Sequence, residues 1–473
     1  MSIRKDPGFR KSLPVLVAAS IASFMVNLDT SIVSIALPTL TNVMQSNSSQ
    51  VSRIILFYLL AIVSFLLFFG RLGDRIGKKP VFLTGYALFT SASVLCGMSR
   101  GLNILIAMRF LQGIGGAMLF ATMSAIVIQN IGDEYRGRAF SAIAMFSGVG
   151  VALGAPLGGF IVGNFGWRWI FYINLLPGLI GFYLASKKLR KESRSREVDE
   201  GYDFPGIFTS SIALLALIVA MNNGTELGWF STKIIALVLS TIVLSVLFII
   251  REKSTKYPLI KLGIFSNLKL SSGLLTKLGV VAILNGTFVL FPFFFENVMK
   301  ISTTNTGLLI GVFPVVVLFA SPLSGSLTDR VGSSKICSVS TFLILAASVM
   351  FVAFRYSMAL PLVIPAFMVF GFAIGLFFPA NMKLVMNQAE KGKEGILTAI
   401  NSMANFLGAA LGVAFMETVF SIGFPAVHNF SDLQPAEIAT GFGRAMISGV
   451  ILSVLSVIFA VWSTRKARKT AAG

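Results

Sequence analysis

The chain is built of long apolar runs separated by short polar gaps. Fourteen runs reach about 17 residues or more, which is enough for a helix to cross roughly 30 Å of hydrocarbon. The pattern therefore predicts an all-α membrane protein with fourteen spans. The runs begin near Leu13, Ile54, Val81, Leu102, Ala139, Trp167, Gly206, Ile234, Leu268, Gly307, Ile336, Leu360, Ile396 and Ala445.

The polar gaps differ sharply in positive charge. If the N-terminus is cytoplasmic, the cytoplasmic gaps and the two tails hold 30 of the 39 Lys and Arg residues, and the outer gaps hold seven. Cytoplasmic loops of membrane proteins collect Lys and Arg, so this bias predicts that both termini are cytoplasmic. The basic start followed by an apolar stretch is also typical of a secretory signal, but the first run continues to Leu37 and we expect an uncleaved first helix.

Composition excludes several classes of function. Hydrophobic residues make up 55% of the chain and the mean hydropathy is +0.84. That is more apolar surface than one soluble core can bury. The net charge of +20 lies in the gaps between spans, which favours lipid headgroups over nucleic acid. The two cysteines, Cys96 and Cys337, lie in different halves and indicate neither a disulfide nor a metal site. We expect no cofactor, and a protein that functions as a monomer.

A charged, glycine-rich turn occurs twice. The segment 70–79 returns 255 positions later as 325–335, each time between two apolar runs. Such repeats are typical of transporters built from two related halves. The residues of these cytoplasmic turns that we expect to latch the halves together are Gly70, Asp74, Arg75, Gly77 and Lys79 in the first and Asp329, Arg330 and Lys335 in the second.

The repeat also predicts the domain organisation. Residues 1–187 form an N-terminal six-helix bundle, and residues 268–473 form a C-terminal six-helix bundle with a cytoplasmic tail. Residues 188–267 supply linkers and two inserted spans. The fifth run carries a stripe of small residues, which lets helices pack closely and could also form a sliding seam. Its members are Gly150, Gly154, Pro156, Gly158 and Gly159, and Pro156 is expected to kink the helix.

Ionisable residues inside spans identify the candidate site. Each costs about 2.5 to 3.5 kcal/mol at a helix centre, so each needs a reason. Asp29 and Arg109 fall at similar depth and are expected to handle protons and substrate, with a structural ion pair as the alternative. Glu417 is expected near the outer end of its span. Lys277 is expected to extend to the cytoplasmic surface, and His428 lies on an outer loop as ordinary surface.

Several segments resemble the major facilitator superfamily, and specifically its fourteen-span drug:proton antiporters. The similar stretches are 28–38, 70–79, 109–117, 150–159 and 166–177. The resemblance implies two bundles rocking around a central cavity, with proton entry driving export. By position, Asp29 and Glu417 resemble acids assigned to protons and cationic substrates, and Arg109 resembles an arginine of proton coupling. Pro156 stands one place later than usual, and the tenth run lacks an acid before Asp329, which argues against recognition of divalent cations.

The resulting hypothesis is a proton-coupled exporter of amphipathic, cationic small molecules in a bacterial inner membrane. Its partners are the small-molecule substrate, protons and the bilayer. One alternative is the same fold carrying a lipid, a siderophore or another metabolite. A second is a membrane-embedded enzyme acting on lipids, which lacks a clustered catalytic set. An ATP-driven pump is disfavoured because the sequence contains no phosphate-binding loop.

Overall fold

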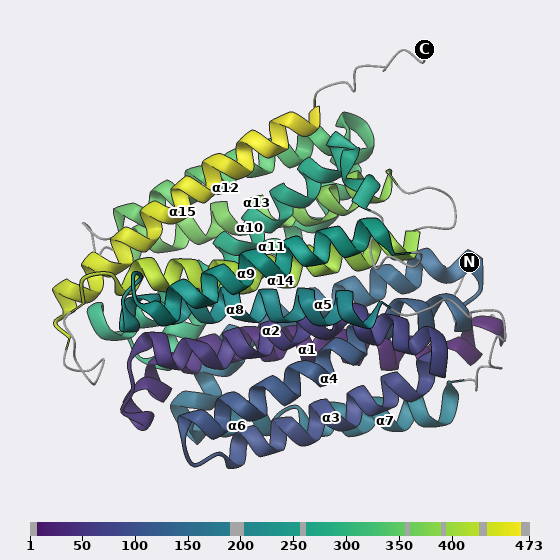
Figure 1. Cartoon of the computed structure of the whole chain (residues 1–473), viewed down its shortest axis with the longest axis horizontal. Coiled ribbons are helices and arrows are strands. Elements are labelled where there is room, and N and C mark those ends of the chain that lie inside the picture. The colour runs from purple at the N-terminus through teal and green to yellow at the C-terminus, as the bar shows by residue number, and fades with distance from the viewer. Residues whose placement is uncertain are drawn as a thin grey trace.

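A computed structural model describes residues 7–189, 203–255, 262–354, 360–388, 394–424 and 433–464. Every regular element in these ranges is a helix, and Figure 1 shows them lying side by side in one bundle. The N-terminal half contains α1 (Pro7–Met44), α2 (Ser48–Ile76), α3 (Lys78–Met98), α4 (Leu102–Asn130), α5 (Asp133–Phe165), α6 (Trp169–Tyr172) and α7 (Leu175–Lys188). The inserted pair is α8 (Phe204–Leu227) and α9 (Thr232–Ser254). The C-terminal half contains η2 (Leu262–Ser266), α10 (Leu268–Phe293), η3 (Phe294–Val298), α11 (Thr303–Val331), α12 (Ser333–Ala353), α13 (Leu360–Met386), α14 (Glu394–Ser421) and α15 (Pro435–Thr464).

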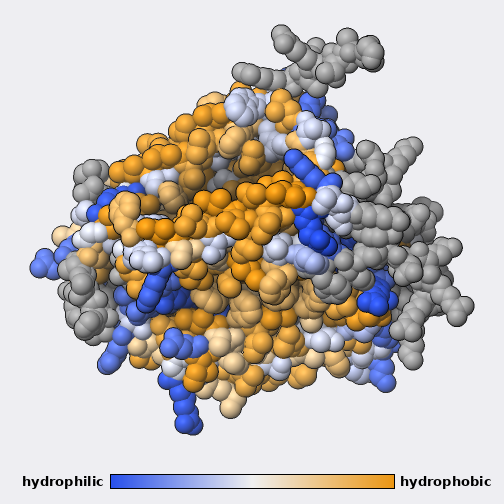
Figure 2. All heavy atoms as spheres, in the orientation of Figure 1, coloured by the Kyte–Doolittle hydropathy of each residue, from blue (hydrophilic) through white to orange (hydrophobic). Residues whose placement is uncertain are grey.

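The helices account for the predicted spans. Thirteen candidate spans in the described ranges are long and apolar enough to cross a bilayer, with α6 and α7 together forming one of them. The remaining predicted span is α8, whose apolar stretch Pro205–Met221 is shorter. Figure 2 shows a broad apolar surface across the middle of one face, with hydrophilic side chains gathered toward its two ends. This is the surface expected of a protein surrounded by lipid.

Several boundaries differ from the sequence prediction. α1 continues to Met44 rather than Leu37, α2 begins at Ser48 rather than Ile54, and α15 begins at Pro435 rather than Ala445. These extensions are polar or mixed in composition, so hydropathy alone does not predict them. Their backbone is nevertheless helical, because packing against neighbouring helices stabilises it. α5 runs through Pro156 as a single helix. His428 lies outside the described residues.

The repeated turn has the same backbone geometry in both halves. Gly77 joins α2 to α3 with a φ of 98°, and Gly332 joins α11 to α12 with a φ of 99°. A side chain at either position would be strained, since L-residues rarely adopt this region. The internal repeat seen in the sequence is therefore also a repeat of structure. In the orientation that the charge bias predicts, this side of the molecule is cytoplasmic and the opposite side is outer.

The small residues of α5 serve two different seams. A Cβ atom at Gly154 would clash with the Cβ of Ser31, so Gly154 packs against α1 within the N-terminal half. A Cβ atom at Gly159 would lie 2.7 Å from the carbonyl oxygen of Thr303 and 3.0 Å from the Cα of Gly307, on α11 of the other half. Gly150 and Gly158 also face α1, whereas Pro156 faces Gly311 of α11.

The seam between α5 and α11 is closed on the outer side only. The face of α11 that carries Gly307 and Gly311 continues one and two turns later with Val315 and Leu318, which are 50% and 40% exposed. On α5 a Cβ atom at Gly148, three turns before Gly159, would have no heavy atom within 4 Å. The two halves thus meet at their outer ends and separate toward the cytoplasm along this seam.

The inserted pair crosses the boundary between the halves. α8 packs against both α2 and α14, and α9 packs against α8. The hydroxyl of Ser211 donates to the carbonyl oxygen of Ser64 on α2 (2.9 Å), and the hydroxyl of Thr418 on α14 donates to the carbonyl oxygen of Met221 (2.9 Å). α8 is therefore hydrogen-bonded to both halves, while α9 presents most of its surface outward.

Candidate functional site

Asp29 and Arg109 form an ion pair deep inside the N-terminal half. The Nη1 atom of Arg109 on α4 donates to Oδ2 of Asp29 on α1, and both side chains are fully buried. Asp29 lies fifteen residues before the end of α1. At the rise of an α-helix this is about 22 Å from that end, which is deeper than the sequence suggested. The sequence prediction that the two residues share one layer is confirmed. In this conformation the carboxylate faces its own bundle rather than a cavity between the halves.

The second carboxylate oxygen of Asp29 is held by two amides. Gln112 on α4 donates to Oδ1 of Asp29 over 2.9 Å, and Asn174, at the break between α6 and α7, donates to the same atom over 3.0 Å. Both amides also donate to the hydroxyl of Ser93 on α3, at 3.2 and 3.1 Å. The network thus connects α1, α3, α4 and the α6–α7 junction, and it satisfies the charge of a carboxylate that has no access to water.

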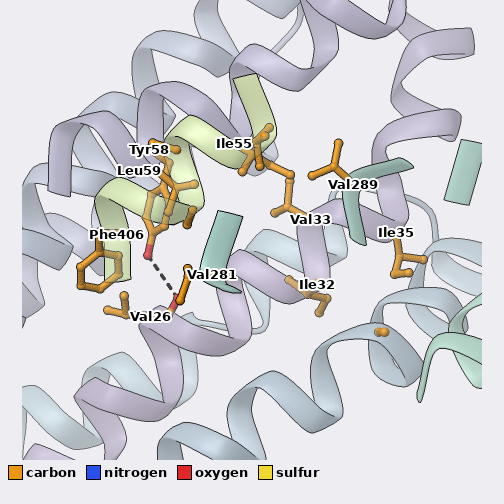
Figure 3. Close-up of a cluster of buried hydrophobic side chains, with 14 of the residues drawn as sticks. Val26, Ile32, Val33, Ile35, Ile55, Tyr58, Leu59, Val281, Val289 and Phe406 are labelled. Carbon is orange, nitrogen blue, oxygen red and sulfur yellow. Dashed lines mark hydrogen bonds between the residues drawn. The ribbon is translucent and has the colours of Figure 1, made fainter. Parts of the chain in front are cut away.

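Arg109 has further partners on α2. Its Nε atom donates to the carbonyl oxygen of Ile54 over 3.2 Å, and its guanidinium carbon lies 4.1 Å from the centre of the Tyr58 ring. A cation above an aromatic face is stabilised by the negative potential of the ring. The Tyr58 hydroxyl in turn donates to the carbonyl oxygen of Val26 on α1 over 3.3 Å, the dashed line in Figure 3. Arg109 is therefore fixed from three sides.

Sequence reasoning missed the two amides and the serine. Gln112 is one turn after Arg109 on the same helix face, so its spacing could have indicated a shared partner. Asn174 interrupts the apolar run of the sixth span, and a polar side chain inside a span is a signal of buried hydrogen bonding. Which helix it would reach could not be read from spacing, because the contact joins positions that are 145 residues apart.

Glu417 occupies a separate place, between the two halves at their outer ends. Its side chain is buried, and its Oε1 atom accepts hydrogen bonds from Ser421 (2.7 Å) and from Ser48 (3.2 Å), the first residue of α2. The positive end of the α2 dipole favours a carboxylate at this position. Asp29 and Glu417 are thus not brought together: one stabilises a bundle interior, and the other bridges the bundles.

The prediction for Lys277 was wrong. We expected its side chain to reach the cytoplasmic surface, but it is 7% exposed and lies beside α13, with its Nζ atom 6.0 Å from the centre of the Phe378 ring. Lys277 is nine residues beyond the first residue of α10. That spacing places it about 14 Å from the start of the helix. From this depth the lysine side chain is too short to reach the cytoplasmic surface, because neighbouring helices cover it.

The carboxylates of the cytoplasmic turns pair within their own halves. Asp74 pairs with Lys78, and Asp329 pairs with Lys383 of α13. Lys79 donates to the carbonyl oxygens of Ser186 (2.9 Å) and Leu189 (2.6 Å) at the end of α7. The remaining turn residues that we singled out lie at the cytoplasmic surface: Gly70, whose carbonyl accepts from Lys78, and the exposed Arg75, Arg330 and Lys335.

The charged groups of the site are one balanced ion pair, without a candidate metal site in the described ranges. Within the described ranges there is no group of three or more His, Cys, Asp or Glu side chains that could hold a metal ion. In this pair the negative charge of the Asp29 carboxylate is balanced by the positive charge of the Arg109 guanidinium. A proton added to the carboxylate would leave the guanidinium charge unbalanced.

Known proteins match the chain along most of its length. Residues 19–413 match the Major Facilitator Superfamily. The riboflavin transporter RibZ of Clostridioides difficile is 28% identical over 456 residues, covering 96% of this chain and 98% of that protein. The multidrug transporter MdtP of Bacillus subtilis is 25% identical over 427 residues (89% and 77%). The multidrug resistance protein Stp of Mycobacterium tuberculosis is 26% identical over 413 residues (87% and 76%).

Solved structures agree on the fold. A bacterial homologue of the lysosomal transporter Spinster, in an inward-facing conformation, superposes with a TM-score of 0.68 at 15% identity and covers 95% of this chain and 96% of that one. A D-xylose–proton symporter gives a TM-score of 0.67 at 14% identity, with 97% and 98% covered. With the helices, the repeat and the family match taken together, the chain belongs to the Major Facilitator Superfamily and is a multi-pass secondary transporter of the cell membrane, not an enzyme.

Proposed function

We propose that this transporter is a proton-coupled exporter of amphipathic small molecules, of the fourteen-span drug:proton antiporter type. The observation that carries the proposal is the fully buried Asp29–Arg109 pair in a structure whose halves meet at the outer ends. Two of the relatives are multidrug proteins, and the two inserted helices complete the fourteen spans of that type.

The proton acts by competing with Arg109 for Asp29. When Asp29 is ionised, Arg109, Gln112 and Asn174 hold it and tie α1 to α4 and the α6–α7 junction. Protonation from the outer side removes the charge that these donors need, and breaking a buried ion pair costs about 3 to 5 kcal/mol. An inward proton provides about 2.3 kcal/mol per 100 mV, so a gradient of ordinary size supplies a comparable amount.

The charge of the cargo needs a separate argument. We based the expectation of cationic cargo on Asp29, but its carboxylate is already balanced by Arg109 in this conformation. We therefore propose that the cargo is amphipathic. Any preference of the transporter for cationic cargo would come from Glu417 alone. Riboflavin-like cargo is the second candidate, favoured by the similarity to the riboflavin transporter over nearly the full length of both chains. Lipids and siderophores remain alternatives of the same fold class.

The test uses the purified full-length protein in proteoliposomes. An imposed pH gradient should drive accumulation of a fluorescent lipophilic cation, or of riboflavin, in vesicles with wild-type protein. Asp29→Asn keeps the shape of the side chain but fixes it in an uncharged form. We expect it to lose transport driven by the pH gradient while retaining exchange of labelled for unlabelled substrate, which needs no net proton movement.

Two results would contradict the proposal. Undiminished pH-driven transport by Asp29→Asn would show that the Asp29 carboxylate does not couple protons to transport. A wild-type protein that exchanges substrate but ignores the gradient would remove proton coupling altogether. Glu437→Gln, which changes a partly exposed carboxylate at the start of α15 that accepts from the backbone N–H of Gln434, is the control and should retain coupling to the pH gradient.

A further inference from the structure

The cytoplasmic part of α1 is partly exposed along one face, and its outer part is buried. Leu13, Val17, Phe24 and Asn27 follow one face of this helix and are partly exposed, whereas every residue from Ile32 to Pro38 is buried. α1 contacts α2, α4, α5 and α7 of its own half and α10 of the other half, so its exposed face lies toward the region between the halves.

Lys277 is buried on α10, the helix of the C-terminal half that contacts α1. Val281, one turn later on the same face, belongs to the cluster in Figure 3, together with Val26 of α1 and Tyr58 of α2. α10 therefore presents this face to the N-terminal half. The ammonium group of Lys277 is 6.0 Å from the centre of the Phe378 ring on α13.

The surroundings of Lys277 are held in place by α13. The Nδ2 atom of Asn381 donates to the carbonyl oxygen of Gly273 over 2.8 Å, which fastens α13 to α10 one turn before Lys277. The side chain of Asn381 is 1% exposed, and its Oδ1 atom has no hydrogen-bond partner in the part of the chain that the structure describes. A cation, an aromatic ring and a carboxamide thus lie within about one helical turn of each other.

No acid of the described ranges balances Lys277. None of the ion pairs found there includes it, and Asp29 is already held by Arg109. A buried ammonium among apolar side chains is costly, and such residues in spans usually mark a substrate or ion pathway. A bound molecule that carries a negative charge would supply what these residues do not.

We propose that Lys277 and Phe378 form a subsite for the anionic group of an aromatic, amphipathic cargo. The ammonium binds a carboxylate, sulfonate or phenolate oxygen, and the Phe378 ring packs against the adjoining ring of the cargo. The inference rests on the proposed export function for the entry of cargo, and it adds aromatic molecules with an anionic group to the amphipathic cargo of that function.

Equilibrium binding tests the subsite without any transport. The probes are fluorescein, a dianion in mildly alkaline buffer, and a rhodamine ester, a cation built on the same three fused rings. Anisotropy of each probe is measured with the purified full-length protein in detergent. We expect Lys277→Met to raise the dissociation constant of fluorescein about tenfold or more, because a hydrogen-bonded charge is lost, and to leave rhodamine binding equal or tighter. Lys277→Arg should retain fluorescein binding.

The control is Lys269→Met, which removes a charge from the cytoplasmic start of the same helix and should leave both probes unchanged. The subsite is overturned if Lys277→Met leaves fluorescein binding intact, if it weakens both probes equally, or if wild-type protein does not bind fluorescein. Retained rhodamine binding reports that the variant is folded. Since this assay involves no pH gradient, failure of proton coupling and failure of the subsite give different results.

Discussion

The hydroxyl of Ser48 donates a hydrogen bond to Oε1 of Glu417 over 3.2 Å, and this contact joins the two halves of the transporter at their outer ends. Ser421 donates to the same oxygen over 2.7 Å, but it lies one turn further along α14, within the same half as Glu417. This acceptor atom therefore takes a hydrogen bond across the seam from Ser48 and a local one from Ser421. This geometry allows the crossing contact to be tested separately from the local one.

Ser48→Ala should loosen the outer closure. A hydrogen bond to a charged group contributes about 1.5 kcal/mol or more, so its loss should raise the population of outward-open molecules about tenfold. The measurement is labelling of an Ile35→Cys reporter by a membrane-impermeant maleimide from the outer side, since Ile35 is buried in this conformation. Ser421→Ala is the matched control, and an equal increase in labelling for both variants would contradict the bridging role of Ser48.

Gly159→Ala should also disfavour the present conformation. The added methyl group would lie 2.7 Å from the carbonyl oxygen of Thr303, where only backbone could give way. Overpacking of this kind costs about 1 to 3 kcal/mol, which should increase outer labelling of the same reporter and slow transport. Gly148→Ala, on the same helix with no heavy atom within 4 Å of its new Cβ, should have no such effect. The idea fails if the two variants behave alike.

Asn174→Ala should lower the stability of the N-terminal half. It removes one donor from Oδ1 of Asp29 and one from Ser93, both of which are buried. Leaving buried acceptors with fewer partners costs about 1 to 3 kcal/mol, so thermal unfolding in detergent should begin at a lower temperature. Asn164→Ala, which loses only an intrahelical bond to Phe160 at an exposed site, should unfold as the wild type does. Equal stability of the two variants would contradict a stabilising role of the hydrogen-bond network around Asp29.

Asp329→Asn should impair transport more than stability. The side chains of Asp329 and Lys383 are 72% and 41% exposed. An ion pair so open to water contributes less than about 1 kcal/mol. If Asp329 also helps to close the cytoplasmic side in the opposite state, transport should fall severalfold while thermal unfolding is nearly unchanged. Lys383→Met breaks the same pair without removing the carboxylate. Identical transport by the two variants would mean that Asp329 acts only through its ion pair with Lys383.

The fold could be predicted from sequence because the bilayer imposes a length and a charge rule on every span. The repeated turns at Gly77 and Gly332 were readable for a similar reason: each needs glycine for its backbone angle. Helix ends were less predictable. The last turns of α1, near Met44, carry few strongly apolar residues, and their helical state depends on packing that spacing does not encode.

The site was predictable only in part. Asp29 and Arg109 are conspicuous as charges within apolar runs, and their depth suggested that they meet. Asn174 and Glu417 show why the rest could not be read. The first reaches Asp29 only because α6 ends at Tyr172, and the second meets Ser48 only because α2 begins six residues before the apolar run does. Both contacts depend on how helices end, which is set by tertiary structure.

The hydrogen bonds of α8 have a mechanical consequence. In the proposed transport cycle the two bundles tilt against each other, yet Ser64 of one bundle and Thr418 of the other are both hydrogen-bonded to this one helix. Each tilt must therefore stretch or exchange one of the two fastenings and carry α9 sideways through the surrounding lipid. We therefore expect the transport rate to depend on bilayer thickness and lateral pressure. A twelve-helix relative, without the added hairpin, would lack this dependence.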